Sequence, residues 1–157
     1  MKTVQKGQMV PDFTLESTGD LFVLNQHRGR CLVLYFYPKD NTPGCTQEGL
    51  DFHARKAAFA RAGADVFGIS RDSLSAHHRF KEKQGFHFDL LADPGEEVCQ
   101  LFDVMKSKVM FGKKVRGIQR STFLIDEHGV LRHEWRKVKV LGHVEEVLQT
   151  LKALKAA

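Results

Sequence analysis

The stretch that most constrains the fold of this chain is a buried strand that leads through a short loop into a helix. Residues 31–37 (Cys-Leu-Val-Leu-Tyr-Phe-Tyr) form a nearly continuous apolar run, which is typical of a strand covered on both faces. Pro38 ends this run, and Pro43 suits the first position of a helix, where its missing N–H would be unpaired in any case. With Thr42 as the helix N-cap, Cys45 lies in the first helical turn. A strand joined in this way to a helix predicts an α/β fold with parallel strands.

The position of Cys45 predicts a reactive thiol. Its sulfur would lie near the unpaired backbone N–H groups at the start of the helix and near the positive end of the helix dipole. Sites of this kind lower the pKa of a cysteine from about 8.5 to between about 3.5 and 7.5. We therefore expect Cys45 to act as a nucleophile.

Length and composition fit one globular domain over residues 1–157. Hydrophobic residues make up 42% of the chain, and no apolar run approaches the roughly 20 residues that span a membrane. The N-terminus carries lysines without an apolar stretch behind them, so no secretory signal is expected. The three cysteines have no regular spacing, which argues against a disulfide framework. These features predict a cytoplasmic protein without a membrane partner.

Turn residues and hydrophobic periodicity predict the other elements. Two hairpins are expected, an N-terminal one over residues 12–17 and 21–25 and a later one over residues 121–126 and 130–136. Further strands are expected over residues 64–70 and 88–92, and helices over residues 43–62, 73–84, 94–102 and 142–155. This order predicts a mixed central sheet flanked by helices.

The formal net charge is +5, and much of the positive charge lies in two short segments. The cations are Lys106, Lys108, Lys113, Lys114 and Arg116 in the first segment, and Arg132, Arg136, Lys137 and Lys139 in the second. We expect residues 106–117 to form an exposed basic loop with room for a short strand. Its cations are not interleaved with aromatic residues that would stack on single-stranded nucleic acid, so a solvated surface is the simpler interpretation. A basic module that binds nucleic acid or another partner through loop 106–116 is the alternative.

The pattern Pro38-x-x-x-Thr42-x-x-Cys45 is similar to the active-site motif of peroxiredoxins, which are thiol peroxidases. The fuller run over residues 37–48 resembles the bacterioferritin-comigratory branch, also called PrxQ. Segments 10–15, 67–70 and 120–126 (Arg-Ser-Thr-Phe-Leu-Ile-Asp) extend the resemblance over nearly the whole chain. The resemblance implies a thioredoxin-like fold, no cofactor, and reduction of hydrogen peroxide and organic hydroperoxides.

The resemblance also implies a role for each residue of the site. Cys45 would attack a peroxide oxygen and become a sulfenic acid, and Arg120 would supply positive charge to the reacting atoms. Thr42 would hydrogen-bond the sulfur or the peroxide, and Pro38 would shield the pocket. Glu48 would support Arg120 or the local helix. Without the resemblance, Arg120 would be an ordinary surface cation and Thr42 only a helix cap.

The chain departs from the branch at the position of a second, resolving cysteine. Many members have a cysteine five residues after the reactive one, where this chain has Leu50. Cys31 would lie roughly 20 Å from the active end of its strand, too far for a disulfide. Cys99 is the remaining candidate for the resolving thiol. We expect a one-cysteine cycle in a monomer, with reduction by an external thiol such as thioredoxin, glutaredoxin or glutathione.

Two other classes of site are disfavoured by residue spacing. His77 and His78 would point about 100° apart on a helix, so they are poorly placed to share a metal ion, and no metal site is expected. A disulfide reductase would need Cys-x-x-Cys, and position 48 is Glu rather than Cys.

Overall fold

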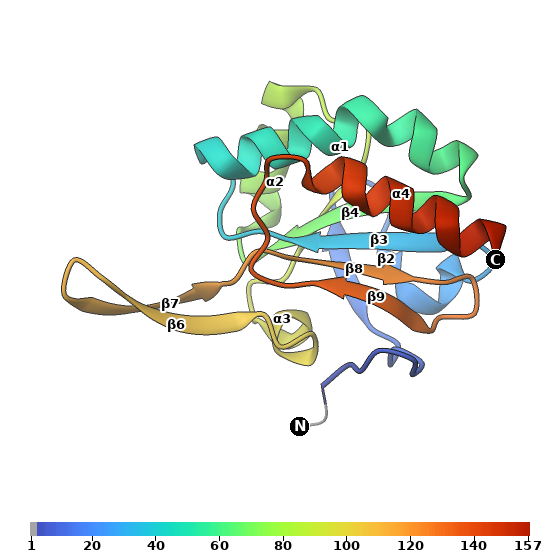
Figure 1. Cartoon of the computed structure of the whole chain (residues 1–157). Coiled ribbons are helices and arrows are strands. Elements are labelled where there is room, and N and C mark those ends of the chain that lie inside the picture. Colours follow the sequence, from blue (N-terminus) through green and yellow to red (C-terminus); the bar gives the residue numbers. More distant parts are fainter. Residues whose placement is uncertain (1–2) are drawn as a thin grey trace.

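A seven-stranded mixed sheet organises the molecule in a computed structural model that describes residues 3–157 (Figure 1). Its strands lie in the order β2-β1-β5-β4-β3-β8-β9. The three central strands are parallel: β3 (Cys31–Phe36), β4 (Ala64–Ser70) and β5 (Leu90–Ala92). The flanking strands are antiparallel: β1 (Thr14–Ser17), β2 (Phe22–Val23), β8 (Ser121–Ile125) and β9 (Leu131–Trp135).

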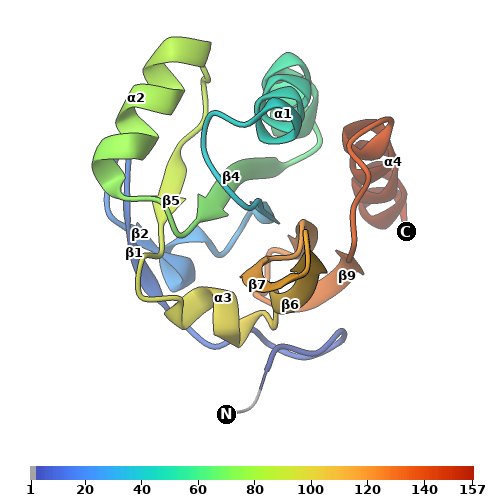
Figure 2. The same cartoon turned by 90° about the vertical axis from the view of Figure 1, so that its left-hand side faces the viewer.

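Helices cover both faces of this sheet. Helices α1 (Pro43–Arg61), α2 (Leu74–Gln84) and α4 (His143–Ala156) lie on one face, and the short α3 (Glu97–Leu101) and the N-terminal segment lie on the other (Figures 1 and 2). A 3-10 helix, η1 (Leu24–His27), follows β2. The expected mixed sheet with flanking helices is confirmed. No helix within residues 3–157 is both long enough and apolar enough to cross a membrane.

Strand β3 separates two hydrophobic cores because its successive side chains point to opposite faces. Leu32, Leu34 and Phe36 belong to the core beneath α3, whereas Val33 and Tyr35 belong to the core beneath α1, α2 and α4. All six residues of the strand are buried, as the continuous apolar run predicts.

Most predicted helices and strands agree with the structure to within two or three residues at each end. Helix α2 begins after Ser73, whose hydroxyl accepts a hydrogen bond from the N–H of Ala76 (3.1 Å), and ends at Gly85 with a φ of 71°. The helix expected over residues 94–102 is shorter, because a turn closed by the Glu96 N–H and the Asp93 carbonyl precedes it.

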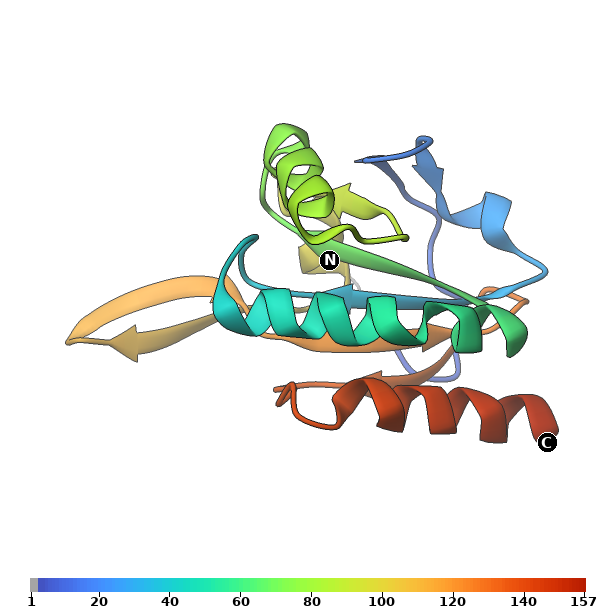
Figure 3. The same ribbon diagram turned by 90° about the horizontal axis from the view of Figure 1, so that it is seen from above.

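The prediction of an exposed basic loop with room for a short strand over residues 106–117 is right about the exposure, but the segment is mostly strand rather than loop. Strands β6 (Met105–Met110) and β7 (Lys113–Ile118) pair over six residues each and form a separate two-stranded ribbon. The ribbon projects away from the sheet beyond the start of α1 (Figures 1 and 3). Its outer residues are exposed, so the apolar alternation that marks a half-buried strand is absent from the sequence.

Four segments meet at one end of the sheet, which we call the Cys45 end. Strand β3 ends and α1 begins there, and Arg120 lies there because β8 runs antiparallel to β3 and pairs Ser121 with Phe36. The base of the ribbon directly precedes Arg120. The loop over residues 136–142, between β9 and α4, reaches the same end, and its Val138 N–H donates to the carbonyl of Arg120 (3.0 Å).

Candidate active site

The reactive cysteine predicted from the sequence lies in the first turn of α1. Cys45 is the third residue of the helix, and only 2% of it is exposed. Its Sγ accepts a hydrogen bond from Nη2 of Arg120, at 3.4 Å. The sulfur therefore has the fixed positive charge of a guanidinium beside it and lies at the N-terminus of a helix.

Arg120 is held against Cys45 by a second partner. Its Nη1 donates to Oε1 of Glu48 at 2.6 Å, so one guanidinium bridges the two residues. Gly44 leaves room for this approach, because a Cβ at that position would lie 3.2 Å from Nη2 of Arg120. Of the site residues that the sequence indicated, Arg120 thus makes direct contact with two, Cys45 and Glu48.

Glu48 is fully buried, and its second oxygen, Oε2, has no hydrogen-bond partner within the described part of the chain. Burial raises the pKa of this carboxyl to about 7, even though the guanidinium of Arg120 pulls it in the opposite direction. Burial acts to lower the pKa of the Arg120 guanidinium, but the Glu48 carboxyl and the Cys45 sulfur together hold that pKa above its ordinary value. Arg120 therefore keeps its charge while Glu48 titrates near neutral pH.

Thr42 occupies the N-cap position but does not cap the helix with its side chain. Its carbonyl accepts from the N–H of Thr46 (2.8 Å), while its hydroxyl donates to the carbonyl of Lys39 (2.9 Å). The predicted side-chain cap is therefore wrong. A hydroxyl has one proton, so in this conformation Thr42 can only accept a hydrogen bond from a further group.

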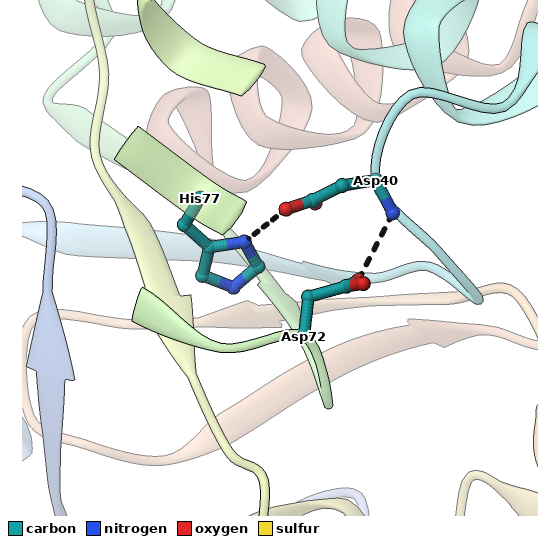
Figure 4. A group of neighbouring side chains, drawn as sticks. All are labelled: Asp40, Asp72 and His77. Atoms are coloured by element: carbon teal, nitrogen blue, oxygen red, sulfur yellow. Dashed lines mark hydrogen bonds and ion pairs between the residues drawn. The ribbon is translucent and has the colours of Figure 1, made fainter. Parts of the chain in front are cut away.

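The loop that carries Pro38 is fastened to α2 by a buried network (Figure 4). Oδ2 of Asp40 contacts Nδ1 of His77 at 2.6 Å, and Oδ1 accepts from the hydroxyl of Tyr37 at 2.6 Å. The N–H of Asp40 donates to Asp72 at 2.9 Å. Pro38 itself lies exposed in the loop. The network fixes the segment between the end of β3 and the start of α1.

Asp40, Asp72 and His77 are also the one group of possible metal ligands found within residues 3–157. Nε2 of His77 contacts the carbonyl of Leu91 at 2.9 Å, so Asp40 and Leu91 occupy both ring nitrogens. Asp72 accepts from the hydroxyl of Ser70 as well as from Asp40. These side chains satisfy one another, and their chemistry is that of a structural network.

Sequence reasoning missed two buried residues near the site, Tyr35 and His143. The hydroxyl of Tyr35 is buried without a partner among the described residues, and burial with the nearby charges of Glu48 and Cys45 raises its pKa. His143 contacts the hydroxyl of Thr122 through Nε2 (2.8 Å), and burial lowers its pKa to about 4, so it is neutral at pH 7. Neither these residues nor the Asp40–His77 pair has a local sequence signal, because the groups that surround them come from other segments of the chain.

The other two cysteines lie away from Cys45. Cys99 is fully buried in the core on the opposite face of the sheet, and burial together with Asp93 raises the pKa of its thiol. Cys31 begins β3, at the end of the strand far from Cys45, and its thiol contacts Oε2 of Glu127 at 3.6 Å. All three cysteines are free.

An α/β sheet that presents a cysteine in the first turn of a helix, against an arginine that directly precedes a neighbouring strand, defines a thiol-dependent peroxidase of thioredoxin-like fold. The chain belongs to the AhpC/TSA family, whose family model matches residues 6–134.

Individual relatives narrow this assignment. The chain is 54% identical over 137 residues to peroxiredoxin Bcp of Xanthomonas campestris pv. campestris. The matched region covers 87% of this chain and 86% of that relative. It is 50% identical over 151 residues to peroxiredoxin Bcp of Bacillus subtilis, covering 96% of each. Among solved structures, Xanthomonas campestris Peroxiredoxin Q superposes with a TM-score of 0.87 at 51% identity, covering 91% of each chain. A cysteine-to-serine mutant of Xylella fastidiosa PrxQ superposes with a TM-score of 0.91 at 43% identity, covering 98% of each chain. The protein is thus a peroxiredoxin of the Bcp/PrxQ kind.

Proposed function

We propose that Cys45 is the residue that attacks the peroxide. The sulfur forms a bond to one peroxide oxygen, the O–O bond breaks, and the second oxygen leaves with a proton as water or an alcohol. The observation that carries this proposal is the 3.4 Å contact between Cys45 Sγ and Arg120 Nη2, because a guanidinium at that place can stabilise the charge that moves from sulfur to oxygen. Glu48 is a positioning residue that orients Arg120 through the 2.6 Å ion pair.

Thr42 and Pro38 have supporting roles in this proposal. The hydroxyl of Thr42 turns from the Lys39 carbonyl to the peroxide when substrate binds, which exchanges one hydrogen bond for another. Pro38 forms part of the rim of the entrance, at the end of the loop that the Asp40 network fixes. Both assignments predict that substitution of Thr42 or Pro38 changes the rate of peroxide reduction more than the free energy of unfolding.

We infer that the substrates include hydrogen peroxide and organic hydroperoxides. A structural study of the bacterioferritin comigratory protein of Xanthomonas campestris concerns its alkyl peroxide reduction activity, and that protein is 51% identical to this chain in the superposed region. The likeness supports the same class of substrate here.

The positions of the other thiols support a one-cysteine cycle. Cys99 would have to cross from the opposite face of the sheet to reach Cys45, and Cys31 lies at the other end of β3. An external thiol therefore attacks the Cys45 sulfenic acid, releases water and forms a mixed disulfide, which a second thiol then reduces. Thioredoxin, glutaredoxin and glutathione are the candidate reductants, and we place this cycle in a monomer in the cytoplasm.

Peroxide consumption tests the proposal. Wild type, Cys45→Ser and Cys99→Ser should be compared on hydrogen peroxide and cumene hydroperoxide, each with thioredoxin or with glutathione and glutaredoxin. We expect Cys45→Ser to be inactive and Cys99→Ser to remain active. Peroxide consumption by Cys45→Ser would overturn the assignment of the nucleophile.

The intact mass of the wild-type protein distinguishes a one-cysteine cycle from a cycle in which Cys99 resolves the Cys45 sulfenic acid. After one equivalent of peroxide and thiol blocking under denaturing conditions, the one-cysteine cycle predicts a singly oxidised chain with two blocked thiols. A chain with one blocked thiol and a Cys45–Cys99 disulfide would show that Cys99 resolves the sulfenic acid.

A further inference from the structure

Exposed hydrophobic side chains are concentrated at the Cys45 end of the molecule. Seven large hydrophobic residues are exposed among residues 3–157, and five of them lie on the ribbon or on the 136–142 loop. They are Val109, Met110, Phe111, Val115 and Leu141. Single exposed hydrophobic residues need no explanation, but their collection at one end marks a contact surface.

Phe111 has the most unusual position of the five. It is 99% exposed at the turn of the ribbon, and its φ of 52° lies in the left-handed region, as does that of Gly112 (75°). This turn favours Asn-Gly, because a bulky side chain costs about 1 kcal/mol in the left-handed region. The fold therefore gains neither packing nor a relaxed backbone from a phenylalanine at this place, which points to a contact outside the chain.

Cations surround these hydrophobic residues. Lys108, Lys113 and Lys114 flank the turn, and none of them makes an ion pair within the described part of the chain. Lys106 and Arg116, nearer the base of the ribbon, are paired with Asp103 and Glu96. The outer ribbon thus presents apolar side chains and three uncompensated charges together.

We propose that the outer part of the β6–β7 ribbon, residues 108–115, binds the surface of anionic phospholipid bilayers. Phe111 and Met110 enter the boundary between headgroups and acyl chains, and the three lysines contact the lipid phosphates. Lysine can extend its charged end to the headgroups while its methylenes stay near apolar surface, whereas lysine is depleted in protein–protein interfaces. Charge complementarity also disfavours a second copy of the chain as the occupant, because pairing two ribbons would bring their lysines together.

This proposal departs from the expectation that the protein has no membrane partner, although it requires no membrane-spanning helix. The ribbon joins the body directly before Arg120, so binding through its tip turns the Cys45 end toward the bilayer (Figure 3). The binding step does not depend on any step of the peroxidase cycle. It can therefore be tested separately from the proposed function.

Co-sedimentation with vesicles tests the proposal at 0.1 M salt. The probes are vesicles of phosphatidylcholine and phosphatidylglycerol in a roughly 3:1 ratio, and vesicles of phosphatidylcholine alone. We expect wild type to bind the anionic vesicles and not the neutral ones. Each lysine contributes roughly fivefold to the partition coefficient, so the triple variant K108Q/K113Q/K114Q should lose roughly 100-fold.

Phe111→Asn tests the apolar contact without disturbing the turn. Asparagine accepts the left-handed conformation, so the variant should be at least as stable as wild type, while vesicle binding should fall roughly tenfold or more. Leu21→Asn is the matched control, because Leu21 is 59% exposed in the β1–β2 turn at the opposite end of the sheet. The matched control for the triple lysine variant is K56Q/R61Q/K152Q, which removes the same number of positive charges from α1 and α4. Activity on hydrogen peroxide serves as the folding check for every variant.

Several results would overturn the proposal. They include equal binding of wild type to neutral and anionic vesicles, no binding to either, and binding by Phe111→Asn at the level of wild type. If the ribbon variants raised the KM for a protein reductant, or abolished retention on DNA, while vesicle binding stayed unchanged, the ribbon would serve a protein or a nucleic acid instead.

Discussion

At the scale of single residues, Arg120 links the proposed nucleophile, Cys45, to the buried carboxyl of Glu48 that holds the guanidinium in place. One guanidinium nitrogen contacts the Cys45 sulfur and another contacts the Glu48 carboxyl. The planar, forked shape of the guanidinium allows both contacts at once, which the single ammonium of lysine cannot reproduce in the same geometry.

Arg120→Lys should therefore slow the reaction of the reduced enzyme with peroxide, by about 10²–10³-fold. The charge is kept in this variant, so the loss would reflect geometry. Stopped-flow measurement of the peroxide step gives the rate. Arg132→Lys is the control, because Arg132 forms a half-exposed pair with Asp126 away from the site, and it should react at the wild-type rate. A wild-type rate for Arg120→Lys would contradict the bridging role.

Gly44→Ala should separate stability from activity. Alanine is the better helix former, so the free energy of unfolding should rise by up to about 1 kcal/mol. The new Cβ would lie 3.2 Å from Arg120 Nη2 and displace the guanidinium by a few tenths of an ångström, which should slow the peroxide step roughly tenfold.

Urea unfolding and stopped-flow kinetics on the same preparation measure both effects of Gly44→Ala. Gly95→Ala adds a methyl group where no atom lies within 4 Å, and it should leave the peroxide rate unchanged. If Gly44→Ala kept the wild-type rate, the close approach of Arg120 to Gly44 would have no catalytic importance.

At the scale of elements, the loop between β3 and α1 depends on its attachment to α2. Asp40 receives contacts from the Tyr37 hydroxyl and the His77 ring, and all three side chains are buried. A buried polar network of this kind stabilises only when every member keeps its partner.

Asp40→Asn should lower the free energy of unfolding by about 2 kcal/mol, because one carbonyl oxygen cannot replace the two carboxylate oxygens that face the Tyr37 hydroxyl and the His77 ring. Urea denaturation measures this change. Asp65→Asn, which breaks the exposed pair with Arg30, should cost less than about 1 kcal/mol. Equal effects of the two substitutions would show that the Asp40–His77 contact does not hold the loop.

At the scale of the whole molecule, the parallel arrangement of β3, β4 and β5 places the candidate active site and the ribbon at the same end of the sheet. The start of α1, Arg120, the ribbon and the 136–142 loop all lie at the end where these strands finish (Figures 1 and 2). The burial of Glu48 at this end also affects the stability of the whole protein.

The free energy of unfolding should decrease as pH rises from about 4.5 to about 7. The folded-state pKa of Glu48, about 7, lies above its ordinary value of 4.5, so in this range the folded protein holds a proton that the unfolded chain has lost. Unfolding is then favoured by higher pH. Since one pKa unit corresponds to about 1.4 kcal/mol, the decrease is at most about 3 kcal/mol.

Denaturation of wild type and Glu48→Gln across this pH range measures the contribution of Glu48. The difference in free energy between the two should change with pH in the predicted direction, whereas Glu82→Gln, at an exposed glutamate, should parallel wild type. A constant difference between wild type and Glu48→Gln would mean that Glu48 is ionised throughout.

The local sequence was sufficient to predict most elements around the site. The apolar run of β3, the proline that opens α1 and the Ser73 and Gly85 caps of α2 each act over a few residues, so their structure follows from nearby side chains. The side-chain cap by Thr42 was the local prediction that failed, because the Lys39 carbonyl competes for the same hydroxyl.

By itself, the sequence determined the α/β order, because short-range sterics and hydrophobic periodicity encode it, and its motifs carried the family resemblance and the prediction that Cys45 is reactive. Only the tertiary structure decided that Arg120 bridges Cys45 and Glu48 across 75 and 72 residues, and that His77 fastens the Asp40 loop across 37. It also decided that Cys99 lies beyond the sheet from Cys45 and that residues 105–118 form a projecting ribbon. These contacts depend on how distant segments pack together, which no local pattern of residues records.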